Sequence, residues 1–251
     1  MADMPAKSRQ GTNKPAALAA RRVRKRGPAR RFIRAVVSAI VLIALLPVVL
    51  LPVYSALNPP ITTVMIAKRI AGASIIKTWR PIEAISPHLV RAVIVAEDGQ
   101  FCTHSGIDWQ QVEAVLSDAE NDGPLRGAST ITMQVVKNLF LWSGRSWLRK
   151  GLEVPLALYA DAVLSKRRIM EIYLNIVEWD KGIYGAEAAA LHYFGVSASR
   201  LNATQAARMA ATLPAPRLRN PARPGRTTGR LAGLYARRAA AAGPYVACVL
   251  N

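Results

Sequence analysis

The stretch SPHLVRAVIVAEDGQF, residues 86–101, predicts a helix that ends in a carboxylate. Ser followed by Pro is a typical helix start, with Ser at the N-cap and Pro at the first helical position. The apolar residues Val90, Val93 and Ile94 share one helical face with a glutamate one further turn along the chain. The core-facing stripe of this helix therefore ends in Glu97, and the surrounding domain is expected to be mainly helical.

Glu97 is the first candidate for a catalytic residue. A carboxylate on a core-facing stripe loses water, and both this desolvation and the negative end of the helix dipole raise its pKa. A raised pKa suits a general acid or base. A glutamate that turns to solvent at a frayed helix end explains the same pattern, and periodicity alone does not separate the two. The neighbouring Asp98 should point elsewhere and is interpreted as a hydrogen-bond acceptor that stabilises the fold.

Further helices are expected downstream. One opens at Ser129 or Thr130, and the others cover about 147–164, 166–177, 187–193 and 203–213. The apolar stripe expected for the helix at 147–164 consists of Leu148, Leu152, Leu156, Tyr159 and Val163. Period-two runs are scarce, so any strands should be short.

The segment GASTITMQVVKN, residues 127–138, is a second candidate site. Its polar residues share one face if a helix starts just after Ser129: Thr130, Gln134, Lys137 and Asn138. A glycine, two hydroxyls and a helix N-terminus make an anion cradle, to which the lysine adds a point charge. A capped surface helix with a solvated polar side accounts for the pattern equally well.

A third candidate is formed by Arg145, Arg149 and Glu153, which are spaced at successive steps of four residues. On a helix they stack on one face beside Lys150, where they could bind a pyrophosphate while the carboxylate holds the cations in place. The alternative is an Arg149–Glu153 pair within the helix, which contributes only a few tenths of a kcal/mol. The local pattern alone favours this alternative.

The charge of the chain also limits its function. There are 34 Lys and Arg against 15 Asp and Glu, a formal net charge of +19, which favours nucleic acid, a membrane surface or a phosphorylated substrate as partner. Much of this charge precedes an uncharged apolar run at 35–57, longer than the roughly 20 helical residues that cross a bilayer. Basic residues before the run predict a cytoplasmic N-terminus and attraction to anionic lipids, so no nucleic acid is expected as partner. A cleaved signal peptide is the alternative, but the run is long for one and the Tyr54-Ser55-Ala56 cleavage site is weak.

These patterns divide the chain into five parts. They are a basic cytoplasmic tail at 1–34, a transmembrane helix at 35–57, a membrane-proximal connector at 58–85, a globular domain at 86–221 and a C-terminal tail at 222–251. A short helix is expected within this tail, between Thr228 and Ala242. Cys102 and Cys248 lie in the part expected outside the cytoplasm, where an even pair of cysteines permits a disulfide. We expect this bridge, with two unpaired thiols as the alternative.

Five segments in a fixed order carry a family resemblance: 97–101 with His104 and Gly106, 127–138, 149–153, 166–175 with 184–190, and 207–216. Together they resemble the glycosyltransferase domain of peptidoglycan polymerases, above all the monofunctional biosynthetic peptidoglycan transglycosylases of Gram-negative bacteria. Each segment alone is a weak signal, whereas their order after an anchor is specific. The resemblance covers 82–221. Met133 departs from it where a second Gln is common, and Asp180 stands where Gly is common.

The resemblance implies a mainly α, lysozyme-like fold with a large lobe and a smaller lobe near the membrane. It also implies lipid II and the growing glycan strand as substrates. Glu97 would take the proton from the GlcNAc 4-hydroxyl of the acceptor, whose oxygen attacks the anomeric carbon of the growing chain's terminal MurNAc. Undecaprenyl pyrophosphate would leave with inversion, and Lys137, Arg145 and Arg149 would stabilise its charge.

The same resemblance implies the remaining roles. Glu153 would act as a second catalytic glutamate by orienting the cations or a divalent ion such as Mg²⁺ or Mn²⁺, although the sequence requires no cofactor. The substrate would be positioned by Ser129, Thr130, Gln134 and Asn138. The enzyme would lie in the inner membrane with its catalytic domain in the periplasm, beside membrane lipids and proteins of cell-wall synthesis or division. No transpeptidase domain is expected, because the chain ends at Asn251.

Three other functions compete with this one. A lytic transglycosylase or lysozyme-type hydrolase shares the fold and a catalytic glutamate, but it has no need of a basic pyrophosphate site. A non-catalytic scaffold for cell-wall assembly would retain the motifs as fold elements, and the intact Glu97 and Glu153 argue against it. A membrane-anchored nucleic-acid binder would bind DNA with a steep salt dependence.

Overall fold

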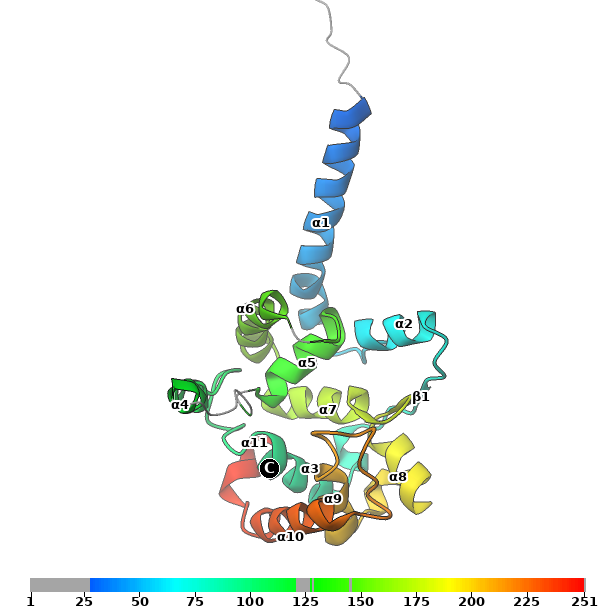
Figure 1. Cartoon of the computed structure of the whole chain (residues 1–251), viewed down its shortest axis with the longest axis vertical. Coiled ribbons are helices and arrows are strands. Elements are labelled where there is room, and N and C mark those ends of the chain that lie inside the picture. Colours follow the sequence, from blue (N-terminus) through cyan, green and yellow to red (C-terminus); the bar gives the residue numbers. More distant parts are fainter. Residues whose placement is uncertain (1–27, 121–126, 128, 145, 251) are drawn as a thin grey trace, which may run out of the picture. The chain divides into compact units, whose positions relative to one another are not determined.

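The computed structural model describes residues 28–120, 127, 129–144 and 146–250. The chain separates into two compact units, 1–43 and 44–251. The second unit contains the globular domain, which is mainly helical as expected (Figure 1).

The apolar run forms α1, Pro28–Val53. The helix starts before the expected residue 35 and includes Arg30, Arg31 and Arg34, but Ala29–Val53 as a whole is long and apolar enough to cross a membrane, which is consistent with a single-pass anchor. The helix includes both prolines of the run and ends at Val53 rather than at the expected Leu57. The residues after Val53 turn instead of continuing the helix.

The remaining helices, in chain order, are α2 (Thr63–Ile70), α3 (Pro87–Glu97), α4 (Trp109–Glu120), α5 (Ile131–Phe140), α6 (Trp147–Val163), α7 (Lys166–Ile176), α8 (Ala186–Phe194), α9 (Ala203–Ala210), α10 (Arg226–Ala240) and α11 (Ala247–Leu250). Short 3-10 helices lie at η1 (Ile82–Ala84), η2 (Ala198–Arg200) and η3 (Pro244–Val246). The strands β1 (Ile76–Lys77), β2 (Glu178–Asp180) and β3 (Ile183–Tyr184) form one small sheet in the order β1-β3-β2. β1 is parallel to β3, and β2 is antiparallel to β3. Each strand has only two or three residues, so the strands are short as predicted.

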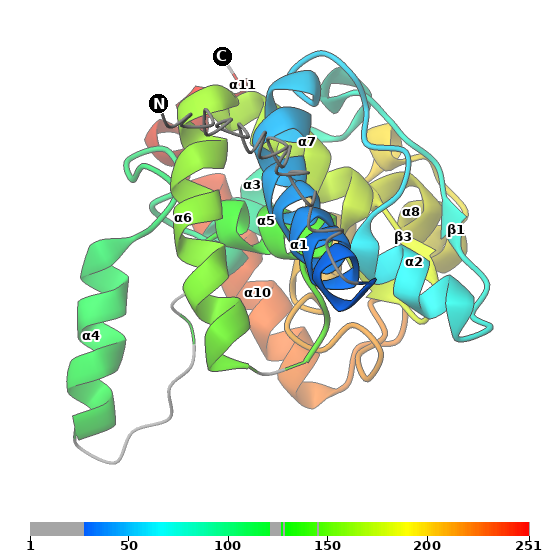
Figure 2. The same cartoon turned by 90° about the horizontal axis from the view of Figure 1, so that it is seen from above.

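The core is built by helix-on-helix packing. α3 packs against α9 and α10, while α5 packs against α6 and α7. Figure 2 shows α6 lying along α5, with α4 standing apart at one side of the domain. The predicted helices downstream of Thr130 all exist. α9 ends at Ala210, because the chain already turns in the residues before Pro214.

α3 begins where the sequence predicts, but its start is held differently. The Ser86 side chain makes no hydrogen bond to the first turn. It is buried, and its hydroxyl donates to the Leu201 carbonyl at 2.7 Å. The backbone N–H of Ser86 donates to the Ala198 carbonyl at 3.0 Å. Ser86 therefore ties the start of α3 to the η2 segment instead of capping its own helix.

The stripe predicted for α6 is only partly right: Leu156, Tyr159 and Val163 are half-buried against the core, but its first two leucines are exposed. Leu148 is 70% exposed and Leu152 is 40% exposed. The buried residues of α6 are Glu153, Ala157 and Ala160. The small side chains allow the close packing of α6 against α5, and the carboxylate is buried because cations neutralise it.

The C-terminal residues beyond Pro221 pack with the domain. α10 lies against α3 and α9, and α11 lies against α7. A disulfide joins Cys102, in the loop after α3, to Cys248 on α11, with the two Cα atoms 5.6 Å apart. This is the pair that the sequence suggested, and it fastens the end of the chain to the loop that follows Glu97.

Reduction of this disulfide is expected to destabilise the domain. The bridge spans 146 residues, and the chain-entropy estimate for a loop of that size is about 5 kcal/mol in the free energy of unfolding. Urea unfolding of the full-length protein in detergent, with and without reductant, measures the difference. The double variant Cys102→Ala/Cys248→Ala should unfold at the lower midpoint and lose all sensitivity to reductant. Equal midpoints for oxidised and reduced wild type would contradict the expectation.

Candidate active site

Glu97 is the last residue of α3 and is held there by a short hydrogen-bond relay. Gln134 on α5 donates from Nε2 to Glu97 Oε2 at 2.9 Å. The Tyr173 hydroxyl on α7 donates to Oε1 of the same Gln134 at 3.3 Å. Because Tyr173 is fully buried, it fixes which end of the Gln134 amide faces the carboxylate. Three helices thus position one carboxylate at the edge of the core.

The surroundings of Glu97 raise its pKa, as the helical pattern predicted. Burial is the main cause, and the negative charge of Asp98 adds to it. The hydrogen bond from Gln134 and the positive charges of Lys137 and Arg219 act in the opposite direction. A carboxylate with a raised pKa, still partly open to solvent, is suited to accept a proton from a substrate hydroxyl.

Asp98 stabilises the fold, in agreement with its predicted role. Its Oδ2 accepts a hydrogen bond from the backbone N–H of Ile131 at 2.9 Å. His104 Nε2 lies 2.9 Å from Oδ1 of the same carboxylate. This arrangement fastens the end of α3 to the start of α5, and it gives His104 a structural role.

Thr130 also uses its hydroxyl inside the fold. Oγ1 accepts from the backbone N–H of Met133 at 3.1 Å, as an N-cap, and donates to the Gly106 carbonyl at 2.6 Å. Gly106 has a φ of +83°, and a Cβ there would lie 2.5 Å from the Ala157 carbonyl oxygen. The loop after α3 can therefore pass against α6 only with glycine at this position. A substrate contact by Thr130 stays a prediction.

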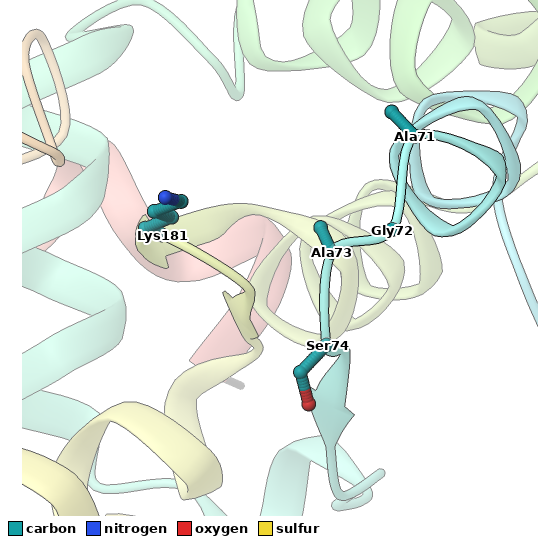
Figure 3. Close-up of a pocket in the computed structure, with 5 residues that line it drawn as sticks. All are labelled: Ala71, Gly72, Ala73, Ser74 and Lys181. Atoms are coloured by element: carbon teal, nitrogen blue, oxygen red, sulfur yellow. The ribbon is translucent and has the colours of Figure 1, made fainter.

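A small depression opens beside the carboxylate. Its lining residues come from the end of α3, the start of α4 and the segment before α5: Glu97, Asp98, Asp108, Gln111, Gly127, Ser129 and Thr130. Figure 3 shows a second hollow, lined by Ala71, Gly72, Ala73, Ser74 and Lys181. That hollow shares no residue with the first and offers one charged group, so the candidate chemistry lies at Glu97.

A cluster of cations lies next to this site. It consists of Lys137 on α5 with Arg149 and Lys150 on α6, and the two α6 cations pair with the buried carboxylate of Glu153. Arg149 Nη1 forms an ion pair with Glu153 Oε1, and Lys150 Nζ lies 3.2 Å from Oε2. Lys150 also donates to the Ser129 hydroxyl at 2.8 Å. The Arg149–Glu153 pair that the local pattern favoured is therefore present, but as part of a larger cluster.

The cations of this cluster repel one another. Burial and the charge of Arg149 lower the pKa of Lys137. Burial, Arg149 and Lys137 together lower the pKa of Lys150 to about 8. The three cations face Glu153 and, beside Lys137, Glu97, so the cluster keeps one positive charge in excess and is suited to an anion such as a pyrophosphate.

The remaining residues singled out by the sequence are not all found at the site. Arg145 lies outside the described residues. Ser129 is exposed and contacts Lys150. Asn138 follows Lys137 on α5, where its backbone carbonyl accepts a hydrogen bond from the Thr63 hydroxyl at 3.2 Å. Met133, at the position where a second Gln is common, is buried with its Sδ 3.9 Å from Lys150 Nζ.

Three residues near the site were not predicted. Lys150 was noted only as a neighbour of Arg149, and its contact with Ser129 depends on how α6 packs against α5. Arg219 and Tyr235 were not considered. Arg219 lowers the pKa of Glu97, and the charge of Glu97 contributes to a raised pKa of Tyr235. Both follow the last motif, and no local pattern in that Arg-rich stretch indicates that it folds back onto α3.

A divalent ion at Glu153 would have to compete with cations already there. Both carboxylate oxygens face Arg149 or Lys150. Among the residues that the structure describes, no group of three or more His, Cys, Asp or Glu side chains is arranged to hold a metal ion. The cluster is therefore better matched to an anionic ligand.

Comparison with known proteins agrees with this geometry. The family model described as Transglycosylase matches residues 65–239, a range that contains Glu97 and the cation cluster. The chain is 60% identical over 211 residues to a biosynthetic peptidoglycan transglycosylase of Brucella suis biovar 1, covering 84% of this chain and 94% of that protein. It is 50% identical over 223 residues to a protein of the same description from Agrobacterium fabrum, covering 88% of this chain and 99% of that protein. The chain therefore belongs to the transglycosylase family, and its helical domain is a peptidoglycan glycosyltransferase of lysozyme-like fold.

Proposed function

We propose that the enzyme polymerises lipid II into glycan strands and releases undecaprenyl pyrophosphate. The observation that carries the proposal is that one helix, α5, links a base on α3 to an anion site. On α5, Gln134 holds the Glu97 carboxylate at 2.9 Å, and Lys137 joins the cation cluster less than one turn later. Lys137 acts electrostatically on both Glu97 and Lys150. A group that removes a proton thus stands beside groups that accept a negatively charged leaving group.

The proposed reaction uses these two halves together. Glu97 takes the proton from the GlcNAc 4-hydroxyl of the acceptor, and that oxygen forms a bond to the anomeric carbon of the donor MurNAc. The bond from this carbon to the pyrophosphate breaks, its electron pair leaves with the pyrophosphate, and the configuration inverts from α to β. Lys137, Arg149 and Lys150 stabilise the charge that develops on the leaving group. Glu153 keeps Arg149 and Lys150 in place, and Ser129 positions a phosphate or sugar oxygen.

The proposed location is the inner membrane, with the catalytic domain in the periplasm. The basic residues before α1 support a cytoplasmic N-terminus. The Cys102–Cys248 disulfide supports an oxidising compartment for the domain. The first turn of α6 exposes two large apolar side chains, with Trp147 83% and Leu148 70% exposed, which supports a position of the site at the membrane surface. Proteins of cell-wall synthesis or division, and a divalent cation, remain proposed partners.

A hydrolase on the same fold is the main alternative, and the products separate it from a polymerase. The full-length enzyme in detergent is incubated in parallel with lipid II and with finished glycan strands. A polymerase should release pyrophosphate-linked lipid from lipid II and leave finished strands intact. Shortening of finished strands without any release from lipid II would contradict the proposal.

The pH dependence of kcat/KM should be bell-shaped. Glu97 must be ionised to accept a proton, so activity falls as the pH drops through its raised pKa. Lys150 must be protonated to bind an anion, so activity also falls as the pH rises through about 8. Lys150→Arg should move the basic limb to higher pH, because arginine keeps its charge. A basic limb that is unchanged in this variant would remove Lys150 from the anion site.

A further inference from the structure

Arg168, near the start of α7, makes an unusual number of contacts with the segment that leaves the membrane anchor. Its Nε donates to the Tyr54 carbonyl at 2.7 Å. Its Nη2 donates to the Leu57 carbonyl at 2.7 Å and to Asn58 Oδ1 at 2.9 Å. Its Nη1 forms an ion pair with Glu171, and its side chain is 13% exposed. One guanidinium thus binds three acceptors within residues 54–58, a stretch that carries little sequence pattern of its own.

The same stretch is fastened by other side chains of the domain. The Tyr159 hydroxyl donates to the Val48 carbonyl at 2.9 Å, near the end of α1. The rings of Tyr54 and Phe140 stack with their centroids 6.4 Å apart. Lys77 Nζ donates to the carbonyls of Pro59 and Pro60 at 2.8 and 2.9 Å. The chain from Val48 to Pro60 is therefore bound to the domain along its length.

Arg168 is the centre of this attachment because it also acts on the later part of the connector, at Trp79 and, through Glu171, at Ile82. Its guanidinium lies 5.4 Å from the ring centroid of Trp79. Its partner Glu171 accepts a hydrogen bond from the backbone N–H of Ile82 at 3.2 Å. Only the planar, multidentate fork of arginine can serve carbonyls, a carboxylate and a ring face at once. None of these contacts involves Glu97 or the cation cluster.

We propose that Arg168 is a positioning residue that fixes the catalytic domain to the exit of its own anchor. The proposal rests on the proposed function, in which both substrates are lipids in the membrane that holds α1. A domain on a loose linker samples many orientations, and most of them face the base and the cation cluster away from the lipid headgroups. When the segment after α1, residues 54–60, is bound to the domain, this orientational freedom is already lost before substrate binds. The effective concentration of the site at the membrane surface rises as a result.

The test compares membrane-bound and dispersed substrate for the full-length enzyme. Arg168→Gln in proteoliposomes should polymerise lipid II about 10- to 100-fold more slowly than wild type. In detergent, with a short-chain soluble lipid II analogue, its kcat should equal that of wild type. Arg168→Lys should recover part of the liposome rate, since it keeps the charge and some of the donors. Arg230→Gln, which removes an equally charged exposed residue on α10, should behave as wild type in both assays.

Two results of the activity assays would overturn the proposal. Equal losses with both substrates would mean that the substitution damages the site itself, and full activity with both would mean that the attachment does not matter. Amide hydrogen exchange gives a readout independent of activity. Arg168→Gln should speed exchange of the amides at 54–58 and leave exchange at 88–97 unchanged, and unchanged exchange at 54–58 would refute the attachment. If wild type polymerises neither substrate, the proposed function fails, and the exchange result still shows whether Arg168 holds the segment after α1.

Discussion

Replacement of Glu97 by glutamine is expected to lower the rate of glycan polymerisation by about 10²- to 10⁴-fold, the usual contribution of general acid–base catalysis. Glutamine has nearly the same shape, and its amide oxygen can still accept the hydrogen bond that Gln134 donates at 2.9 Å. It has no basic oxygen to take a proton from the acceptor hydroxyl. The fold should be retained, because removal of a partly buried charge relieves desolvation rather than adding to it.

Initial rates of lipid II consumption and a thermal unfolding curve, measured on the same preparation, check this expectation. Glu113→Gln, on an exposed position of the neighbouring α4, makes the same chemical change away from the depression and should leave the rate unchanged. A Glu97→Gln enzyme that polymerises at a near-normal rate would exclude Glu97 as the base. A variant that unfolds well below wild type would point to a structural role instead.

Replacement of Lys137 by alanine is expected to lower kcat by about 10²- to 10³-fold, the range found when one preorganised group that stabilises transition-state charge is removed. KM should change less, because the pyrophosphate gains charge mainly as its bond to the sugar breaks. A second effect follows from the position of Lys137 between the two halves of the site. Its charge lowers the pKa of Glu97, so its loss should move the acid limb of the pH profile to higher pH.

The two effects are measured together in pH profiles of kcat and kcat/KM. Lys181→Ala, at an exposed lysine on the turn between β2 and β3, is the matched control and should change neither. A lower kcat with an unmoved acid limb would separate Lys137 from Glu97. An unchanged kcat would remove Lys137 from the leaving-group site.

Local patterns in the sequence predicted the helices well, because each depends on signals within a few residues. Pro87 at the first position of α3, the opening of α5 next to Thr130 and the bounds of α7 are of this kind, whereas the bonds of Ser86 to the η2 segment are not. Periodicity could not show which side of α6 faces the core. Its leucines form the more regular stripe, but the structure buries Glu153 and two alanines, since burial of that carboxylate depends on cations that only the fold brings together.

The candidate site was predictable to the extent that its residues lie in ordered motifs. Glu97 and Lys137 belong to such motifs, and the proposal of lipid II as substrate comes only from the order of the motifs, not from the pKa argument. Tyr235 reaches the site because α10 packs against α3, Arg219 reaches it from the turn after α9, and Arg168 reaches the segment after α1 from α7. Such long-range contacts leave no local trace in composition or spacing.

The central claim is that one site joins a base at Glu97 to a leaving-group site at the cation cluster in order to build glycan. The most direct measurement is gel analysis of the products that the full-length wild type and Glu97→Gln enzymes form from labelled lipid II. The account predicts a ladder of long strands, which lysozyme digests, from wild type and unreacted lipid II from the variant. A ladder of equal intensity from both enzymes, or no strand from wild type, would contradict it.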